Sequence, residues 1–129
     1  MSEADNRRAV ERLLEGINAR NVGVMDEVMT EDCVMSYPQS GEIIRGAANR
    51  RAVYAATPSL PTITTYRTIS SGDIVVTEAV LDYSGDRFNT VFVFECRDGR
   101  IARETVYWSK PFPPAASRAP WIEIEPPGK

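Results

Sequence analysis

Two polar side chains stand among apolar neighbours in a way that could support catalysis: Glu104 and Tyr37. Glu104 lies in the alternating segment Ile101–Lys110, on the same predicted strand face as Val106 and Trp108. A carboxyl group removed from water binds its proton more tightly, which suits acid–base catalysis near neutral pH. A phenol can donate a hydrogen bond to a ligand carbonyl. We therefore predict that Glu104 is an acid or base and that Tyr37 polarises a carbonyl.

Each candidate also has a structural interpretation. Buried carboxylates are usually paired, so Glu104 could instead neutralise Arg51 or another arginine. Tyr37 and Tyr83 could be amphipathic wall residues with their hydroxyls at a pocket rim. Glu78 is predicted to face away from the pocket and to pair with Arg67 across two strands.

The chain of 129 residues contains no histidine. This absence excludes Ser-His-Asp and Cys-His relays and zinc sites with imidazole ligands. Its two cysteines, Cys33 and Cys96, are too few for a thiolate metal site. An acidic group lacks a rigid ligand spacing and is interpreted as a solvated helix end. The members of this group are Asp26, Glu27, Glu31 and Asp32. We therefore expect no metal and no cofactor.

The net charge of −3 gives no basic footprint for nucleic acid. The acidic start of the chain lacks the features of a signal peptide, and no apolar run approaches the length of a membrane span. We expect a cytoplasmic protein that binds neither nucleic acid nor membrane.

Hydrophobic periodicity predicts helices in the first half of the chain and strands in the second. The predicted helices run from Ser2 to about Arg20, from Val24 to Met29 and from Ala47 to Ala56. The predicted strands are Cys33–Tyr37, Glu42–Arg45, Thr62–Ser70, Ile74–Tyr83, Arg87–Cys96 and Ile101–Lys110. This order is typical of an α+β fold in which helices pack on one face of a curved sheet and leave a pocket.

An Asp98-Gly99 turn between the last two strands fixes the expected register. It places Arg97 opposite Arg100, Cys96 opposite Ile101 and Val93 opposite Glu104. The other expected pairs are Val91 with Val106 and Asn89 with Trp108.

We predict one domain, residues 1–110, followed by a proline-rich tail, residues 111–129. The tail is expected to dock on the domain or on a partner subunit, with Trp121, Ile122 and Ile124 as docking residues.

Several motifs, in order, resemble the NTF2-like superfamily and its SnoaL-like, polyketide cyclase-like branch. They are Asn18-Ala19-Arg20-Asn21, Met25-Asp26-Glu27-Val28-Met29, Glu31-Asp32-Cys33-Val34, Gly46, Arg97-Asp98-Gly99-Arg100-Ile101 and Tyr107-Trp108. The resemblance implies an α+β cone, with three N-terminal helices on a strongly curved, mostly antiparallel sheet. It also places Glu104, Val106 and Trp108 on the pocket face of the sheet, which the strand register alone leaves open. The other face also carries bulky apolar residues, so we expect a homodimer through this outer face.

The resemblance does not carry over the catalytic groups of known members. The catalytic base, the oxyanion-hole tyrosine and the partner carboxylic acid of ketosteroid isomerases fall at Tyr37, at Leu13, and at Val91 or Phe92, respectively. The epoxide hydrolase positions correspond to Ala79, Leu81 and Val106, and Ser109 stands where cyclases commonly have an aspartate.

Two functions remain open. One is a cofactor-independent isomerase, cyclase or dehydratase; the other is a non-catalytic ligand-binding or dimerisation module. Either would hold a small hydrophobic or aromatic molecule in the cone. The expected pocket residues are Trp108, Val106, Tyr83, Leu81, Ala79, Asn89, Val91, Val93, Leu13 and Tyr54.

Overall fold

Ser2 caps the first helix, α1 (Glu3–Asn18), in the computed structural model, which describes residues 2–125. The Ser2 hydroxyl accepts a hydrogen bond from the Asp5 N–H, and the Asp5 carboxylate accepts one from the Ser2 N–H. This capping box satisfies two backbone donors that the first turn leaves unpaired. The helix buries an apolar stripe that includes Val10 and Ile17 against the sheet.

Two further helices and six strands follow, close to the predicted boundaries except at the start of the first strand. That strand begins at Met29 instead of the predicted Cys33, because Met29, predicted to end the second helix, already has an extended backbone. The helices are α2 (Val24–Val28) and α3 (Gly46–Ala56). The strands are β1 (Met29–Tyr37), β2 (Glu42–Arg45), β3 (Thr62–Ser71), β4 (Ile74–Tyr83), β5 (Asp86–Arg97) and β6 (Arg100–Ser109).

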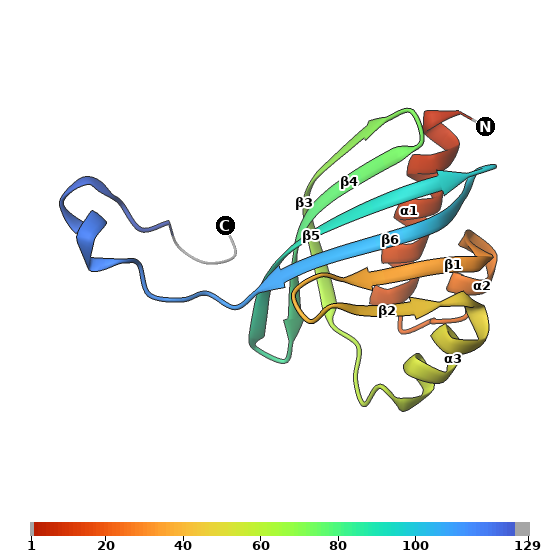
Figure 1. Ribbon diagram of the computed structural model, residues 1–129, viewed down its shortest axis with the longest axis horizontal. Helices are drawn as coiled ribbons and strands as arrows, with labels where there is room; N and C mark the ends of the chain where they lie inside the picture. Colours follow the sequence, from red (N-terminus) through yellow and green to blue (C-terminus); the bar gives the residue numbers. More distant parts are fainter. Residues whose placement is uncertain (1, 126–129) are drawn as a thin grey trace.

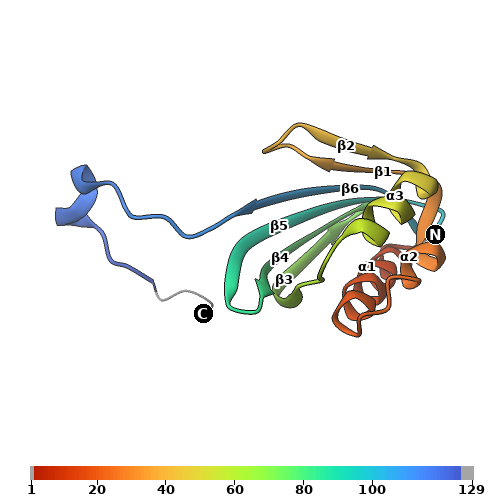
Figure 2. The ribbon, with the colours of Figure 1, turned by 90° about the horizontal axis from the view of Figure 1, so that it is seen from below.

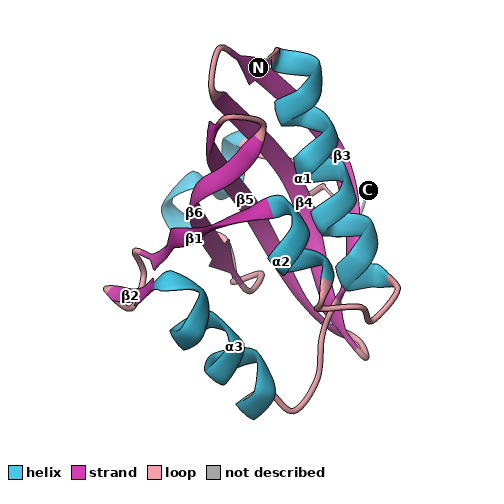
Figure 3. Cartoon of the chain, turned by 90° about the vertical axis from the view of Figure 1, so that its right-hand side faces the viewer, coloured by secondary structure: helices cyan, strands magenta, loops and turns pink. Residues whose placement is uncertain are grey.

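The six strands form one sheet in the order β2-β1-β6-β5-β4-β3. Only β1 and β6 pair in parallel; all other neighbours are antiparallel. Figure 2 shows the sheet curving around the helices, and Figure 3 shows α1 along β3 and β4 and α3 beside β1 and β2. The predicted α+β cone with three helices on a curved, mostly antiparallel sheet is confirmed.

The hairpin between β5 and β6 departs from the predicted register. Asp98 and Gly99 have positive φ angles of 54° and 76°, and Arg97 pairs with Arg100 as a two-residue turn requires. A β-bulge then adds one residue on the β6 side, next to the pair of Cys96 with Ile101.

The bulge shifts every later pair by one residue. Glu104 lies opposite Phe94, Val106 opposite Phe92 and Trp108 opposite Thr90. The predicted pairs of Glu104, Val106 and Trp108 with Val93, Val91 and Asn89 were therefore wrong. Because alternate residues of a strand face opposite sides, those three β5 residues lie on the outer face of the sheet.

The chain beyond Ser109 leaves the sheet and extends away from it (Figure 1). It forms one short 3₁₀ helix, Ala116–Trp121, none of whose residues is buried. Phe112 and Trp121 are 76% and 82% exposed. The last residues of the predicted tail, 126–129, lie outside the described residues.

Candidate functional site

A cavity of about 530 Å³ opens between the inner face of the sheet, helices α1 and α3, and the loop before β3. This volume lies in the usual range of small-molecule pockets. Its walls are mainly apolar and aromatic. The lining residues are Ile17, Tyr37, Val53, Tyr54, Thr57, Ser59, Leu60, Pro61, Ile63, Leu81, Tyr83, Asp86, Phe88, Phe92, Glu104, Val106 and Trp108.

The structure places both proposed catalytic residues in this cavity, along with five of the ten proposed pocket residues. Those five are Tyr54, Leu81, Tyr83, Val106 and Trp108. Leu13 and Ala79 are buried in the hydrophobic core and do not line the cavity. Asn89, Val91 and Val93 are excluded by the bulge, as described above.

Sequence reasoning missed Phe88 and Phe92. The predicted register put these β5 residues on the outer face of the sheet, but they line the cavity. Sequence reasoning also missed Leu60 and Pro61, which approach the cavity from a loop. The two phenylalanines share a strand face with Thr90, which lies opposite Trp108. A register corrected for the bulge would therefore have placed them in the cavity. The loop residues follow no periodic pattern, and only the folded structure reveals them.

Among the described residues, Glu104 supplies the buried carboxyl of the cavity, whereas the other carboxyl in the lining, Asp86, is exposed. Glu104 pairs in the sheet with Phe94 of β5 and Met35 of β1, both buried, and its own residue is only 4% exposed. Its Oε2 atom has no hydrogen-bond partner within the described residues. Burial raises the pKa of Glu104 from its ordinary 4.5 to about 7, against an opposing effect of the Arg50 charge.

Two phenols stand beside this carboxyl. Burial, and then the negative charge of Glu104, raise the pKa of both Tyr37 and Tyr54, and the two hydroxyls also interact with each other. Both phenols therefore stay protonated at neutral pH. They supply O–H donors next to a group that can gain or lose a proton.

Aromatic contacts fix the walls around these polar groups. The rings of Tyr37 and Trp108 meet edge to face, with centroids 5.1 Å apart, and those of Tyr83 and Phe88 do so at 5.8 Å. Such pairs favour one ring orientation. At the end of β6, Lys110 pairs with Asp86 at 3.0 Å and lies over the Phe88 ring.

The end of α1 ties the start of β3 to the helix layer. The Asn18 side-chain amide donates to the Ile63 carbonyl at 2.9 Å and accepts from the Ile63 N–H at 2.6 Å. Arg20, with a positive φ of 64°, ends the helix and donates to the Pro61 carbonyl at 2.7 Å. These bonds hold one wall of the cavity in place.

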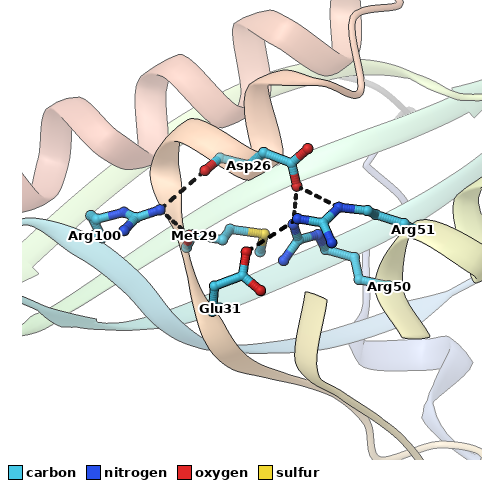
Figure 4. A network of polar contacts seen from close by, with 6 residues as sticks. All are labelled: Asp26, Met29, Glu31, Arg50, Arg51 and Arg100. Carbon is cyan, nitrogen blue, oxygen red and sulfur yellow. Dashed lines mark hydrogen bonds and ion pairs between the residues drawn. The ribbon is translucent and has the colours of Figure 1, made fainter. Parts of the chain in front are cut away.

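The acidic group near α2 lies outside the cavity and is paired with arginines. Asp26 accepts hydrogen bonds from Arg50 and Arg51, and Arg51 also reaches Glu31 (Figure 4). The remaining two pairs are Arg12 with Glu27 and Arg97 with Asp32.

Residues 2–125 contain no group of three or more His, Cys, Asp or Glu side chains that could hold a metal ion. In the same residues, no helix has the length and apolar character needed to cross a membrane.

A sequence model of the SnoaL-like domain matches residues 10–104, most of the chain. The chain belongs to the SnoaL-like family. None of the curated proteins matches it significantly in sequence. Solved structures confirm the NTF2-like fold of this SnoaL-like chain.

Two of these structures match almost end to end. An NTF2-like protein of unknown function from Burkholderia xenovorans is 29% identical, with a TM-score of 0.83 over 96% of this chain and 98% of that chain. A candidate ketosteroid isomerase from Kribbella flavida is 22% identical, with a TM-score of 0.88 over 98% and 93%. Because so little of this SnoaL-like chain lies outside either match, both matches extend into the tail.

A third structure matches the domain with less coverage. An epoxide hydrolase of M. tuberculosis is 25% identical, with a TM-score of 0.69 over 83% of this chain and 84% of that chain. Proteins of this fold therefore include ones named for different reactions, so the reaction of this chain must be argued from its own cavity.

Proposed function

We propose that this protein binds a small hydrophobic or aromatic carbonyl compound in the cone and catalyses its isomerisation, cyclisation or dehydration without a cofactor. The observation that carries the proposal is the buried Glu104 carboxyl, with its unpartnered Oε2, in an otherwise largely apolar cavity. An ionisable group placed in this way costs folding energy, and such costs are typical of catalytic sites.

Glu104 is suited to move a proton in either direction. With a pKa of about 7, the carboxyl is divided between its acid and base forms at neutral pH. In the base form it takes a proton from the carbon next to the ligand carbonyl, and the C–H electron pair shifts to form an enolate. In the acid form it returns that proton to another carbon, or to a leaving hydroxyl.

Tyr37 and Tyr54 are suited to stabilise the enolate. Their raised pKa values keep both O–H groups available as donors to the carbonyl oxygen, where negative charge develops. The aromatic walls exclude water and strengthen these hydrogen bonds.

A Glu104→Gln variant tests the proposal. We screen hydrophobic carbonyl compounds by thermal shift and follow binding through Trp108 fluorescence. For a compound that is turned over, Glu104→Gln is expected to lower kcat by about 100-fold or more and to keep binding within a few-fold. Glu95→Gln, on the exposed end of β5, is the control and is expected to leave both unchanged.

If the wild-type protein binds ligands but converts none, and Glu104→Gln binds them equally well, the enzyme proposal is wrong. The protein would then be a ligand-binding module. Trp108→Ala tests the cavity itself, because it removes a wall residue that packs against Tyr37. It is expected to weaken binding in either case.

We further propose that the protein is a homodimer through the outer face of its sheet. The helices lie on the inner face, and no described element of the chain covers the outer face (Figure 2). Large apolar residues on this face are about half exposed: Ile43, Ile69, Ile74 and Tyr107. Partly buried Val76, Val91 and Val93 lie among them. An exposed apolar area of this kind is typical of an interface.

We propose that the tail docks on the partner subunit of this dimer. Phe112, Trp121 and Ile124 are exposed on a segment that extends away from its own domain, and a six-residue 3₁₀ helix has little stability alone. Matches to solved structures that extend into the tail support a defined course for it.

We propose a cytoplasmic location. Cys33 and Cys96 are both free and buried, and burial raises the pKa of the Cys96 thiol to about 11. Unpaired thiols are common in a reducing compartment.

A further inference from the structure

Arg50 is a buried arginine whose bonding is incomplete. Its side chain on α3 is only 3% exposed, yet it makes a single ion pair, from Nη2 to the Asp26 Oδ1 at 2.6 Å (Figure 4). Its Nε and Nη1 atoms are buried and have no hydrogen-bond partner among residues 2–125. Burying a charged donor without a partner is costly, so these two N–H groups need an explanation.

The Glu104 carboxyl in the cavity also has an unpaired atom, in this case a hydrogen-bond acceptor. Glu104 Oε2 is the acceptor without a partner, and Arg50 is the charged side chain that acts on this carboxyl. The two groups are not in ion-pair contact in this structure. The other titratable groups that feel the Glu104 charge are neutral near pH 7. They are Cys33 and Tyr37 on β1 and Tyr54 on α3.

Arg51, the exposed neighbour of Arg50, also contacts Asp26 but has all of its partners at the surface. Arg51 donates to Asp26 Oδ1 at 3.1 Å, but its side chain is 50% exposed. It also forms an ion pair with a second carboxylate, Glu31. Asp26 is itself 48% exposed. Asp26 thus shares two arginines, and only Arg50 extends into the interior with donors left over.

We propose that Arg50 is a positioning residue for Glu104. Asp26 holds the guanidinium from the outside, and the unpaired N–H groups receive the Glu104 carboxylate whenever it releases its proton. Arg50 is therefore shared between a surface carboxylate and the cavity carboxylate, and the balance between them sets how readily Glu104 ionises. This inference rests on the proposed role of Glu104 as an acid–base group.

The test is the titration of the Glu104 carboxyl, followed by carbon NMR in protein labelled at the glutamate carboxyl. Arg50→Gln removes the positive charge and is expected to raise the pKa of Glu104 by about one unit or more. Asp26→Asn frees Arg50 for the cavity and is expected to lower it. Opposite shifts from two members of one ion pair would not arise from a loss of packing.

Arg51→Gln is the matched control, because it removes an exposed arginine from the same carboxylate. It is expected to leave the pKa of Glu104 unchanged, and Arg50→Lys is expected to restore most of the wild-type value. If Arg50→Gln does not fold, Asp26→Asn and Arg50→Lys still decide the question. The proposal would be overturned if Arg51→Gln and Asp26→Asn shifted the pKa of Glu104 equally. It would also be overturned if this pKa stayed unchanged in the Arg50 and Asp26 variants.

The outcome for Arg50 is separable from the outcome for the proposed function. If wild-type Glu104 titrates near neutral pH but does not respond to these substitutions, only the role of Arg50 fails. If wild-type Glu104 titrates at its ordinary value, the acid–base role itself fails.

Discussion

Glu104 and Asp26 show how burial separates two carboxyl groups in one small protein. Desolvation is the largest single effect on the pKa of Asp26 and raises it, but the hydrogen bonds and charges of Arg50 and Arg51 together lower this pKa below its ordinary value. Glu104 lies in the cavity, where burial dominates and raises its pKa. The first group is ionised and structural. The second can change its charge in the physiological range, and only it faces the space where a ligand would bind.

The raised pKa of Glu104 predicts how stability depends on pH. Between pH 4.5 and about 7 the unfolded chain releases this proton while the folded chain keeps it, so the free energy of unfolding falls as pH rises. The contribution of Glu104 is greatest below pH 4.5 and is lost above about 7. Over this range it amounts to at most about 3 kcal/mol.

Urea unfolding of the wild-type protein and of Glu104→Gln at pH 5 and pH 8 measures this effect. The variant keeps a neutral side chain, so its stability relative to wild type is expected to increase between the two pH values. A constant difference would show that Glu104 ionises at its ordinary pKa.

The residue types identified most of the chemistry, and packing decided the rest. Glu104 and Tyr37 were recognisable because a carboxyl and a phenol interrupt apolar patterns. Arg50 could not be distinguished from Arg51 in the sequence, although one is buried and the other exposed. Both belong to a helix with only two buried residues, so its periodicity gives a weak signal.

At the scale of elements, one bulge accounts for the main error in the predicted site. The Asp98-Gly99 turn and the pairs next to it were predicted correctly. The extra residue that follows has no sequence signature, since Ala102 suits a regular strand equally well. It moved Asn89, Val91 and Val93 from the expected cavity to the expected dimer interface.

The contact between α1 and α2 gives a prediction at this scale. A Cβ atom on Gly16 would lie 2.3 Å from Val24 Cγ1, and Val24 is buried. Gly16→Ala is therefore expected to destabilise the protein by about 1–3 kcal/mol, although alanine favours helices. In thermal unfolding, adding Val24→Ala should cost less in the Gly16→Ala background than in wild type. Additive effects would mean that the two residues do not compete for space.

For the whole molecule, the outer sheet face predicts how the protein assembles. Tyr107 lies opposite Val91 at the centre of this face and is 49% exposed in one chain. Light scattering is expected to give twice the chain mass of 14.3 kDa for wild type and a single chain mass for Tyr107→Glu. Ser59→Glu, on the loop beside the cavity, is the control and is expected to remain dimeric. A wild-type monomer at high concentration would contradict the proposed interface.

Cone, cavity and helix layer together hold the Glu104 carboxyl group out of water, and the proposed function depends most on the state of this group. The most direct measurement is the titration of the glutamate carboxyl carbons in the wild-type protein by NMR, with Glu104→Gln to assign the signal. The proposed function predicts one glutamate signal that titrates with a midpoint near pH 7 and is absent from the variant. A Glu104 signal that titrates near pH 4.5, with the other glutamates, would contradict it.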